Sequence, residues 1–247
     1  MLIMLPDKRK LKNISATAVI ESNLEKLLGD DLMQVRHTIQ ARLETTYPLV
    51  NNILLENMPE HLPRAIITLG TSSLGHSEQK KRVALAAAIE MLHMAVSIHE
   101  MIPRREVIPN EENRLLMGAS ILIGDYCFGQ ASILAASTEN AAVVAAFSEA
   151  LARLSERRVE TLLETPTQPH TDSAILSAAA AEVGALLVKL PAPLRYALRE
   201  AASSFGEVLT DSETSVTEAF LHLESLTKDR PTARPFTNWL RSHHPIQ

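Results

Sequence analysis

The chain has few of the residues that several common protein classes require. Its 247 residues include a single cysteine, Cys127, so no disulfide can form within the chain. Aromatic residues make up only 4%, and 29 acidic residues outnumber 24 basic ones, for a formal net charge of −5. This balance lacks the positive potential of a nucleic-acid-binding protein, so no nucleic-acid partner is expected.

Uninterrupted apolar stretches of membrane-spanning length are also lacking. The apolar start Met1-Leu2-Ile3-Met4-Leu5 is followed at once by Pro6 and a basic cluster, whereas a signal peptide places its charge before a longer apolar run. The apolar stretch 174–188 carries Glu182 and is shorter than the roughly 20 residues of a membrane span. The sequence therefore predicts no export signal, no transmembrane segment and a cytoplasmic location.

The residues that are present favour helices. Ala, Leu, Glu and Arg are abundant and strand signals are scarce. Prolines and capping residues divide the chain into predicted helices at 15–28 (stopped by Gly29), 30–57 (broken at Tyr47-Pro48), 63–74, 77–102, 109–137, 138–163, 171–190, 194–209, 215–226 and a short C-terminal segment. Long apolar helices such as 83–98 need burial on most sides, which favours one large bundle of about ten helices over two small domains. The predicted domain is 1–247, with 1–13 flexible and 228–247 a linker and short terminal helix.

The stretch 86–126 is the most informative part of the sequence, and it resembles the trans-polyprenyl diphosphate synthase (isoprenoid synthase) family. That family has a helix reading approximately A-x-E-x-x-H-x-A-x-x-x-H-D-D-x-x-D, then R-R-G, then A-x-x-x-G-D. The matching residues are Glu90, His93, Ala95, His99, the pair Arg104-Arg105, and Gly124-Asp125-Tyr126. A weaker resemblance extends over residues 31–216. It implies an all-α bundle of the isoprenoid-synthase type.

The chain departs from the family at its metal-binding motifs. In the family, the carboxylates of D-D-x-x-D bind the Mg²⁺ that holds the allylic diphosphate. The corresponding positions here are Glu100, Met101 and Arg104, so one carboxylate remains. At the second aspartate-rich motif only Glu213 could keep a carboxylate, and an ordinary interhelix loop is the favoured interpretation. No catalytic residue and no metal site are expected.

The resemblance leaves a few candidates for binding residues. The family's G-G-K-x-x-R-P signature is missing, with Arg64 as one remnant, and Arg104 and Arg105 are the better diphosphate-binding candidates. An exposed arginine pair is, however, usually just solvated. Ala95 and Val96 fall at the family's cavity-floor positions and are too small to block a long prenyl chain; ordinary core residues are the alternative.

The combined losses resemble the non-catalytic subunit of heterodimeric prenyl synthases. The resemblance implies a catalytically deficient, regulatory or accessory subunit in isoprenoid (quinone side-chain) biosynthesis. Its partner would be a catalytic polyprenyl diphosphate synthase subunit in a heterodimer or larger assembly, which alone would bring Mg²⁺; a homodimer is left open. The alternatives are an active prenyltransferase with an atypical site (Glu100, Arg104, Arg105, Glu213) and an apolar-ligand-binding protein.

Other chemistry has weaker support. Glu90-x-x-His93 matches half of a di-iron motif, but the nearest second copy, Glu218 to His222, has the wrong spacing. His99 could be a general base, although a structural histidine at a helix end is more common. Cys127 lies in an apolar helix and is expected to be buried and inert. The small residues of 141–147 permit close helix approach, either to another subunit or within the monomer.

Overall fold

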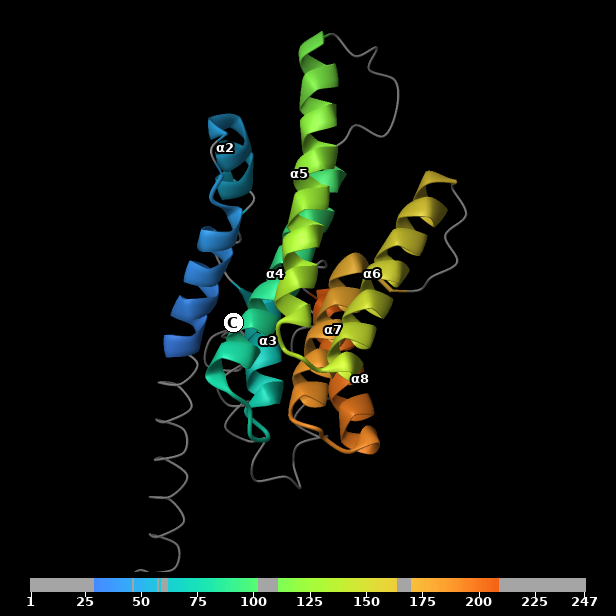
Figure 1. Ribbon diagram of the computed structural model, residues 1–247. Coiled ribbons are helices and arrows are strands. Elements are labelled where there is room, and N and C mark those ends of the chain that lie inside the picture. The colour runs from blue at the N-terminus through green and yellow to red at the C-terminus, as the bar shows by residue number, and fades with distance from the viewer. Residues whose placement is uncertain are drawn as a thin grey trace, which may run out of the picture.

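All regular secondary structure in the described part of the chain is helical. A computed structural model describes residues 29–45, 47–56, 58, 62–101, 111–163 and 170–208. Its elements are a helix over residues 29–43, α2 (Pro48–Glu56), α3 (Pro63–Ser72), α4 (Gln79–Glu100), α5 (Glu111–Ala136), α6 (Ala141–Leu162), α7 (Asp172–Leu187) and α8 (Ala192–Val208), shown in Figure 1. The predicted all-α class is confirmed. The segments 1–13, 215–226 and 228–247 lie outside the described residues.

Most predicted helix boundaries are correct within a few residues, because local signals set them. Pro63 stands at the start of α3, where a missing N–H costs nothing. Asn140 caps α6 by accepting from the backbone N–H of Ala142 and Val143, and Thr171 caps α7 through its side-chain oxygen. These caps satisfy N–H groups that have no partner within their own helix.

The break near Tyr47-Pro48 is confirmed, whereas the helix predicted over 15–28, with its stop at Gly29, lies outside the described residues. Helix 29–43 includes Gly29, and α2 begins at Pro48. Gly29 is thus the first described residue of this helix, and the stop predicted there stays a prediction.

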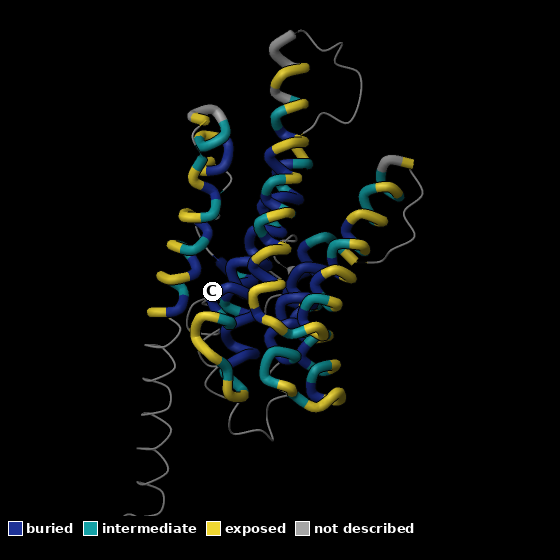
Figure 2. The backbone as a smooth tube through the Cα atoms, in the orientation of Figure 1, coloured by how far each residue is buried: buried dark blue, intermediate teal, exposed yellow. Residues whose placement is uncertain are grey.

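Two helices, α4 and α7, form the centre of the bundle. Helix α4 packs against α3, α5 and α7, while α7 packs against α3, α6 and α8 as well. Buried residues occupy nearly every position of 83–98 in α4 and all of 173–181 in α7, as the dark tube in Figure 2 shows. The predicted burial of 83–98 on most sides is confirmed.

Small residues allow the central helices to approach closely. A Cβ atom added at Gly184 of α7 would lie only 2.6 Å from the carbonyl oxygen of Thr68 in α3 and would overlap the Thr71 side chain. The α3–α7 contact is therefore built around a missing side chain, and it brings the C-terminal half of α3 against the C-terminal half of α7.

Two described helices are long and apolar enough to cross a membrane by length and composition alone. The window in Gln79–Glu100 is 78% buried inside the bundle, as expected of a core helix, whereas the window Met117–Ala136 in α5 is 39% buried. The prediction of no transmembrane segment is untested. Helix α5 carries an apolar surface that the rest of the described chain does not cover.

Candidate functional site

The candidate site lies at the C-terminal end of α4, where the family's first metal-binding motif would stand. Glu100 is the last residue of α4, and its side chain is 48% exposed. Met101 follows it with 44% exposure, so a thioether stands where the family has a second carboxylate. Arg104, Arg105 and Glu213 lie outside the described residues, and their predicted roles remain predictions.

An arginine from α6 binds the Glu100 carboxylate. Arg158 Nη2 donates to Glu100 Oε1 at 2.6 Å and also to Asp172 Oδ2 at 2.6 Å. Arg157 Nε lies 2.8 Å from Asp172 Oδ1, although Oδ1 accepts no well-directed hydrogen bond. We name Glu100, Arg157, Arg158 and Asp172 the pole cluster. It joins the end of α4, the last turns of α6 and the first residue of α7.

The residues of the pole cluster do not fit the Mg²⁺ that the family resemblance implies. Mg²⁺ requires hard oxygen ligands in near-octahedral geometry, but Glu100 is already bound by a guanidinium and its neighbour offers sulfur. Across the described ranges, no group of three or more His, Cys, Asp or Glu side chains is arranged to hold a metal ion.

Sequence reasoning missed Arg157 and Arg158. They belong to an arginine pair on α6 that no family motif marks, and the nearest carboxylate of the cluster is 14 residues away along the chain. A basic pair near the end of an amphipathic helix is ordinarily solvated. Only the tertiary packing, which brings α6 beside α7 and near the end of α4, gives these two arginines their partners.

Arg64, a diphosphate-binding candidate from the sequence, is buried in the core. The residue is 6% exposed at the first turn of α3, and its guanidinium lies 4.0 Å from Glu90 Oε2 and 3.2 Å from Ser173 Oγ. Glu90 is fully buried on α4 and accepts the backbone N–H of Arg64 at 2.9 Å and of Ala65 at 2.8 Å. The carboxylate thus caps α3 from a neighbouring helix, and Arg64 balances its charge inside the bundle.

The electrostatic surroundings of Glu90 and His93 indicate a structural role for this motif. Burial raises the pKa of the Glu90 carboxyl, although Arg64 and the two backbone N–H groups act in the opposite direction. Burial, followed by the charge of Arg64, lowers the pKa of His93 to about 3, so its imidazole is neutral near pH 7. The Glu90-x-x-His93 spacing places a cap and a neutral histidine in the core.

The match to the family's G-D segment has a physical explanation. His99 Nε2 lies 3.4 Å from Asp125 Oδ1 and 3.3 Å from the carbonyl oxygen of Ile121. A Cβ atom at Gly124 would overlap the His99 ring. Gly124 leaves room for the ring and Asp125 faces it, so these residues fix the crossing of α4 and α5; this favours the structural interpretation of His99.

Ala95 and Val96, the predicted cavity-floor residues, are buried in α4 with 0% and 5% exposure. A pocket of about 380 Å³ lies instead between helix 29–43 and α2. Its lining residues are His37, Gln40, Ala41, Leu43, Glu44, Asn51, Leu54, Leu55 and Met58. The cavity-floor role of Ala95 and Val96 stays a prediction.

Cys127 is fully buried and burial raises its pKa to about 12, as an inert thiol requires.

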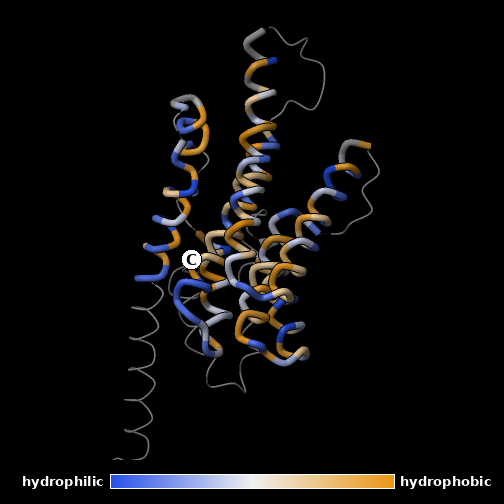
Figure 3. The backbone as a smooth tube through the Cα atoms, in the orientation of Figure 1, coloured by the Kyte–Doolittle hydropathy of each residue, from blue (hydrophilic) through white to orange (hydrophobic). Residues whose placement is uncertain are grey.

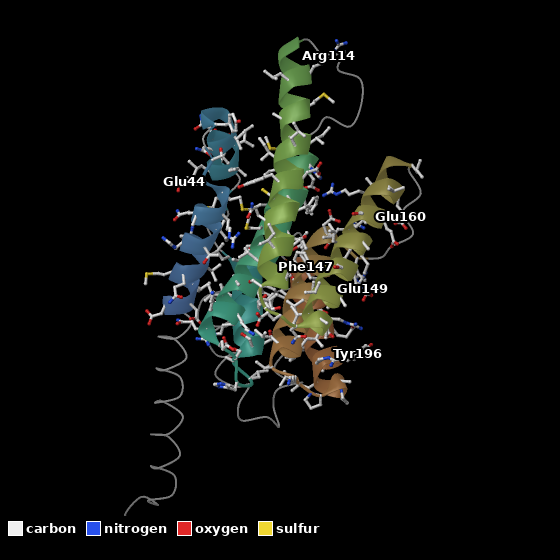
Figure 4. All side chains as sticks on the ribbon, viewed as in Figure 1. Glu44, Arg114, Phe147, Glu149, Glu160 and Tyr196 are labelled. Atoms are coloured by element: carbon white, nitrogen blue, oxygen red, sulfur yellow. The ribbon has the colours of Figure 1, made fainter. Side chains whose placement is uncertain are left out.

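The outward surfaces of α5 and α6 are apolar or small, and we name them the α5–α6 face. On α5 the large exposed residues are Leu115, Ile121, Leu122 and Ile133, and Figure 3 shows this helix as largely apolar. On α6, Val143 and Phe147 are buried, whereas the exposed positions of the first four turns are Ala141, Ala142, Ala145, Ser148, Glu149, Ala152 and Ser155 (Figure 4). Ala141, Ala142 and Ala145 therefore face outward and are not buried by the described residues.

The chain resembles known proteins in sequence and in fold. No family model matches the chain. Over 160 residues it is 25% identical to the octaprenyl diphosphate synthase of Haemophilus influenzae, an alignment that covers 61% of this chain and 47% of the relative. The matched region thus spans about half the length of that curated relative.

Solved structures share the fold. A decaprenyl diphosphate synthase from Rhodobacter capsulatus superposes with a TM-score of 0.62 at 20% identity, covering 92% of this chain and 94% of that one. The geranyl diphosphate synthase small subunit from Antirrhinum majus superposes with a TM-score of 0.59 at 14% identity, covering 83% and 93%. Over part of its length in sequence, and over most of its described length in fold, the chain is thus similar to trans-polyprenyl diphosphate synthases.

Proposed function

We propose that this chain is a catalytically deficient member of its family that acts as the accessory or regulatory subunit of a catalytic polyprenyl diphosphate synthase. The observation that carries the proposal is the state of Glu100. It is the one carboxylate left at the first aspartate-rich motif, and Arg158 binds it at 2.6 Å while Met101 occupies the next position. A diphosphate leaving group needs cation clusters at this point, and these residues do not assemble one.

The α5–α6 face supports the partner part of the proposal. Its exposed leucine and isoleucine side chains lie on one helix, and the neighbouring helix presents alanine and serine. Small residues let a second backbone approach closely, and contiguous apolar surface on a folded chain is typical of protein–protein contacts. A catalytic subunit of the same fold would bring a matching pair of helices.

The product class follows from the matched relatives and remains part of the proposal. One of them is named as an octaprenyl and another as a decaprenyl diphosphate synthase. We infer that the partner makes a long prenyl chain, such as the side chain of a quinone, and that Mg²⁺ enters the assembly only through that partner. A cytoplasmic site of action is proposed with it.

The test is a prenyl-transfer assay with labelled isopentenyl diphosphate, an allylic diphosphate and Mg²⁺. It is run on this chain alone, on the motif-intact synthase from the same organism, and on the mixture. We expect no turnover by this chain alone. In the mixture, we expect a rate or a product length that differs from that of the synthase alone. Turnover by the chain alone, or a mixture indistinguishable from the synthase, would contradict it.

A surface variant tests the proposed interface. Leu122→Glu places a charge in the middle of the apolar surface of α5, where the native side chain is 71% exposed, so folding should be little affected. The matched control is Met33→Glu, a 69% exposed residue on helix 29–43. Co-elution with the synthase in size-exclusion chromatography should be lost only for Leu122→Glu; equal retention by both variants would place the contact elsewhere.

A further inference from the structure

A single guanidinium nitrogen of the pole cluster connects two carboxylates from different helices. Arg158 Nη2 lies 2.6 Å from an oxygen of Glu100 and 2.6 Å from an oxygen of Asp172. The two carboxylate oxygens therefore lie within twice that distance of each other. The three side chains are about half to four-fifths buried, with exposed fractions of 48%, 28% and 20% for Glu100, Arg158 and Asp172.

The location of Glu100 favours a neighbouring cation. Glu100 stands at the C-terminal end of α4, where the helix dipole already presents negative partial charge, so a carboxylate there is unfavourable unless it is balanced. Asp172 adds a second negative charge beside it. At short range, two like charges repel strongly unless a positive charge lies between them.

The same arginine bridges helices that otherwise contact each other little. In the described part of the chain, α6 packs on α7 and on α5, and α4 packs on α3, α5 and α7. Helices α5 and α6 diverge from their connecting turn toward this end of the bundle (Figure 1). The ion pair thus adds a direct link between α6 and the end of α4, two helices that both pack on α7.

We propose that Arg158 is a built-in substitute for a divalent cation. It neutralises Glu100 and Asp172 together and holds the ends of α4, α6 and α7 in place without metal. Arg157, near the other oxygen of Asp172, adds positive charge on the α7 side of the cluster. This role of Arg158 does not depend on a partner subunit. An experiment can therefore contradict it without contradicting the accessory function, and another can contradict the accessory function without contradicting the role of Arg158.

The test compares hydrogen exchange in the full chain, in its Arg158→Gln variant and in the control Arg153→Gln, which removes a positive charge earlier on α6. Each is measured in chelator-treated buffer and with added Mn²⁺. We expect Arg158→Gln to raise exchange at least about tenfold in the last turn of α4 and the first turn of α7, because the carboxylates then repel. Mn²⁺ should reverse that increase, since two carboxylate oxygens can share one ion. The unaltered chain and Arg153→Gln should respond to neither chelator nor Mn²⁺.

A double variant and a folding control complete the test. In Glu100→Gln/Arg158→Gln, Mn²⁺ should have no protective effect, because one of the two carboxylates is gone. If Arg158→Gln does not fold in metal-free buffer, Mn²⁺ should restore its circular dichroism, and Arg158→Met should behave in the same way. Unchanged exchange in folded Arg158→Gln would overturn the proposal. So would increased exchange, or lost folding, that Mn²⁺ does not reverse, because Arg158 would then be an ordinary ion-pair partner.

Discussion

His93 should make the fold sensitive to mild acid. The residue lies on α4, one turn after Glu90, and is partly buried. Burial and the charge of Arg64 hold its folded-state pKa at about 3, against an ordinary value of 6.5. A lowered histidine pKa means that the unfolded chain binds the proton more readily. The stabilising contribution of neutral His93 is therefore complete above about pH 6.5 and is lost as the pH falls toward 3.

The magnitude follows from the two pKa values. Each pH unit within this window is worth about 1.4 kcal/mol, so lowering the pH from about 7 to about 5 should reduce the free energy of unfolding by at most about 2 kcal/mol. Glu90 acts in the opposite direction, because its raised pKa favours the folded state as pH falls. Arg64 stays charged throughout this range.

The assay is urea unfolding, followed by circular dichroism, near pH 7 and near pH 5. In His93→Gln the side chain no longer titrates, so the acid-dependent loss should shrink by about 2 kcal/mol relative to the unaltered chain. His76→Gln, at an exposed position outside the core, is the control and should leave the loss unchanged. A parallel loss of stability in the unaltered chain and in His93→Gln would refute the reasoning.

Three further sets of substitutions test a close helix crossing, a buried ion pair and a helix cap. Gly124→Ala should destabilise the fold by about 1–3 kcal/mol because its Cβ meets the neighbouring histidine ring, whereas Gly129→Ala, with nothing within 4 Å, should be neutral or stabilising. Glu90→Gln and Arg64→Gln should each cost about 3–5 kcal/mol, and the double variant less than their sum, because each single change leaves the other group buried without its partner. Asn140→Ala should cost about 1 kcal/mol by removing the cap of α6. Urea unfolding measures all of them.

Each of these predictions has a clear contrary result. If Gly124→Ala and Gly129→Ala changed the free energy of unfolding equally, α4 and α5 would be able to move apart at their crossing without cost. Additive losses for the two core variants would show that the buried charges do not interact. If Asn140→Ala left the free energy of unfolding unchanged, water would satisfy the first N–H groups of α6 as well as the Asn140 side chain does.

Much of the fold could be predicted from the sequence because helix boundaries depend on nearby residues. Pro63, Asn140 and Thr171 mark the starts of their helices through their own backbone or side-chain chemistry, and the structure confirms them.

The candidate site was only half predictable. The replacement of family carboxylates by Met101 and Arg104 is visible in the sequence, as is the retention of Glu100. The ion pair of Glu100 cannot be predicted from the sequence, because its partner Arg158 is 58 residues away along the chain. Arg64 illustrates the same limit. The sequence predicts it as a diphosphate-binding residue, but in the structure it is buried and balances the charge of Glu90.

By itself, the sequence determined the helical class, most helix boundaries and the residue types at positions 100, 101 and 104. These properties depend on residue identity and on interactions within a few residues, where the geometry is known in advance. The tertiary structure alone decided which charges meet: Glu90 with Arg64, and Arg158 with Glu100 and Asp172. Ion pairs join residues brought together by the packing of whole helices, and electrostatic energies depend steeply on the resulting distances and burial.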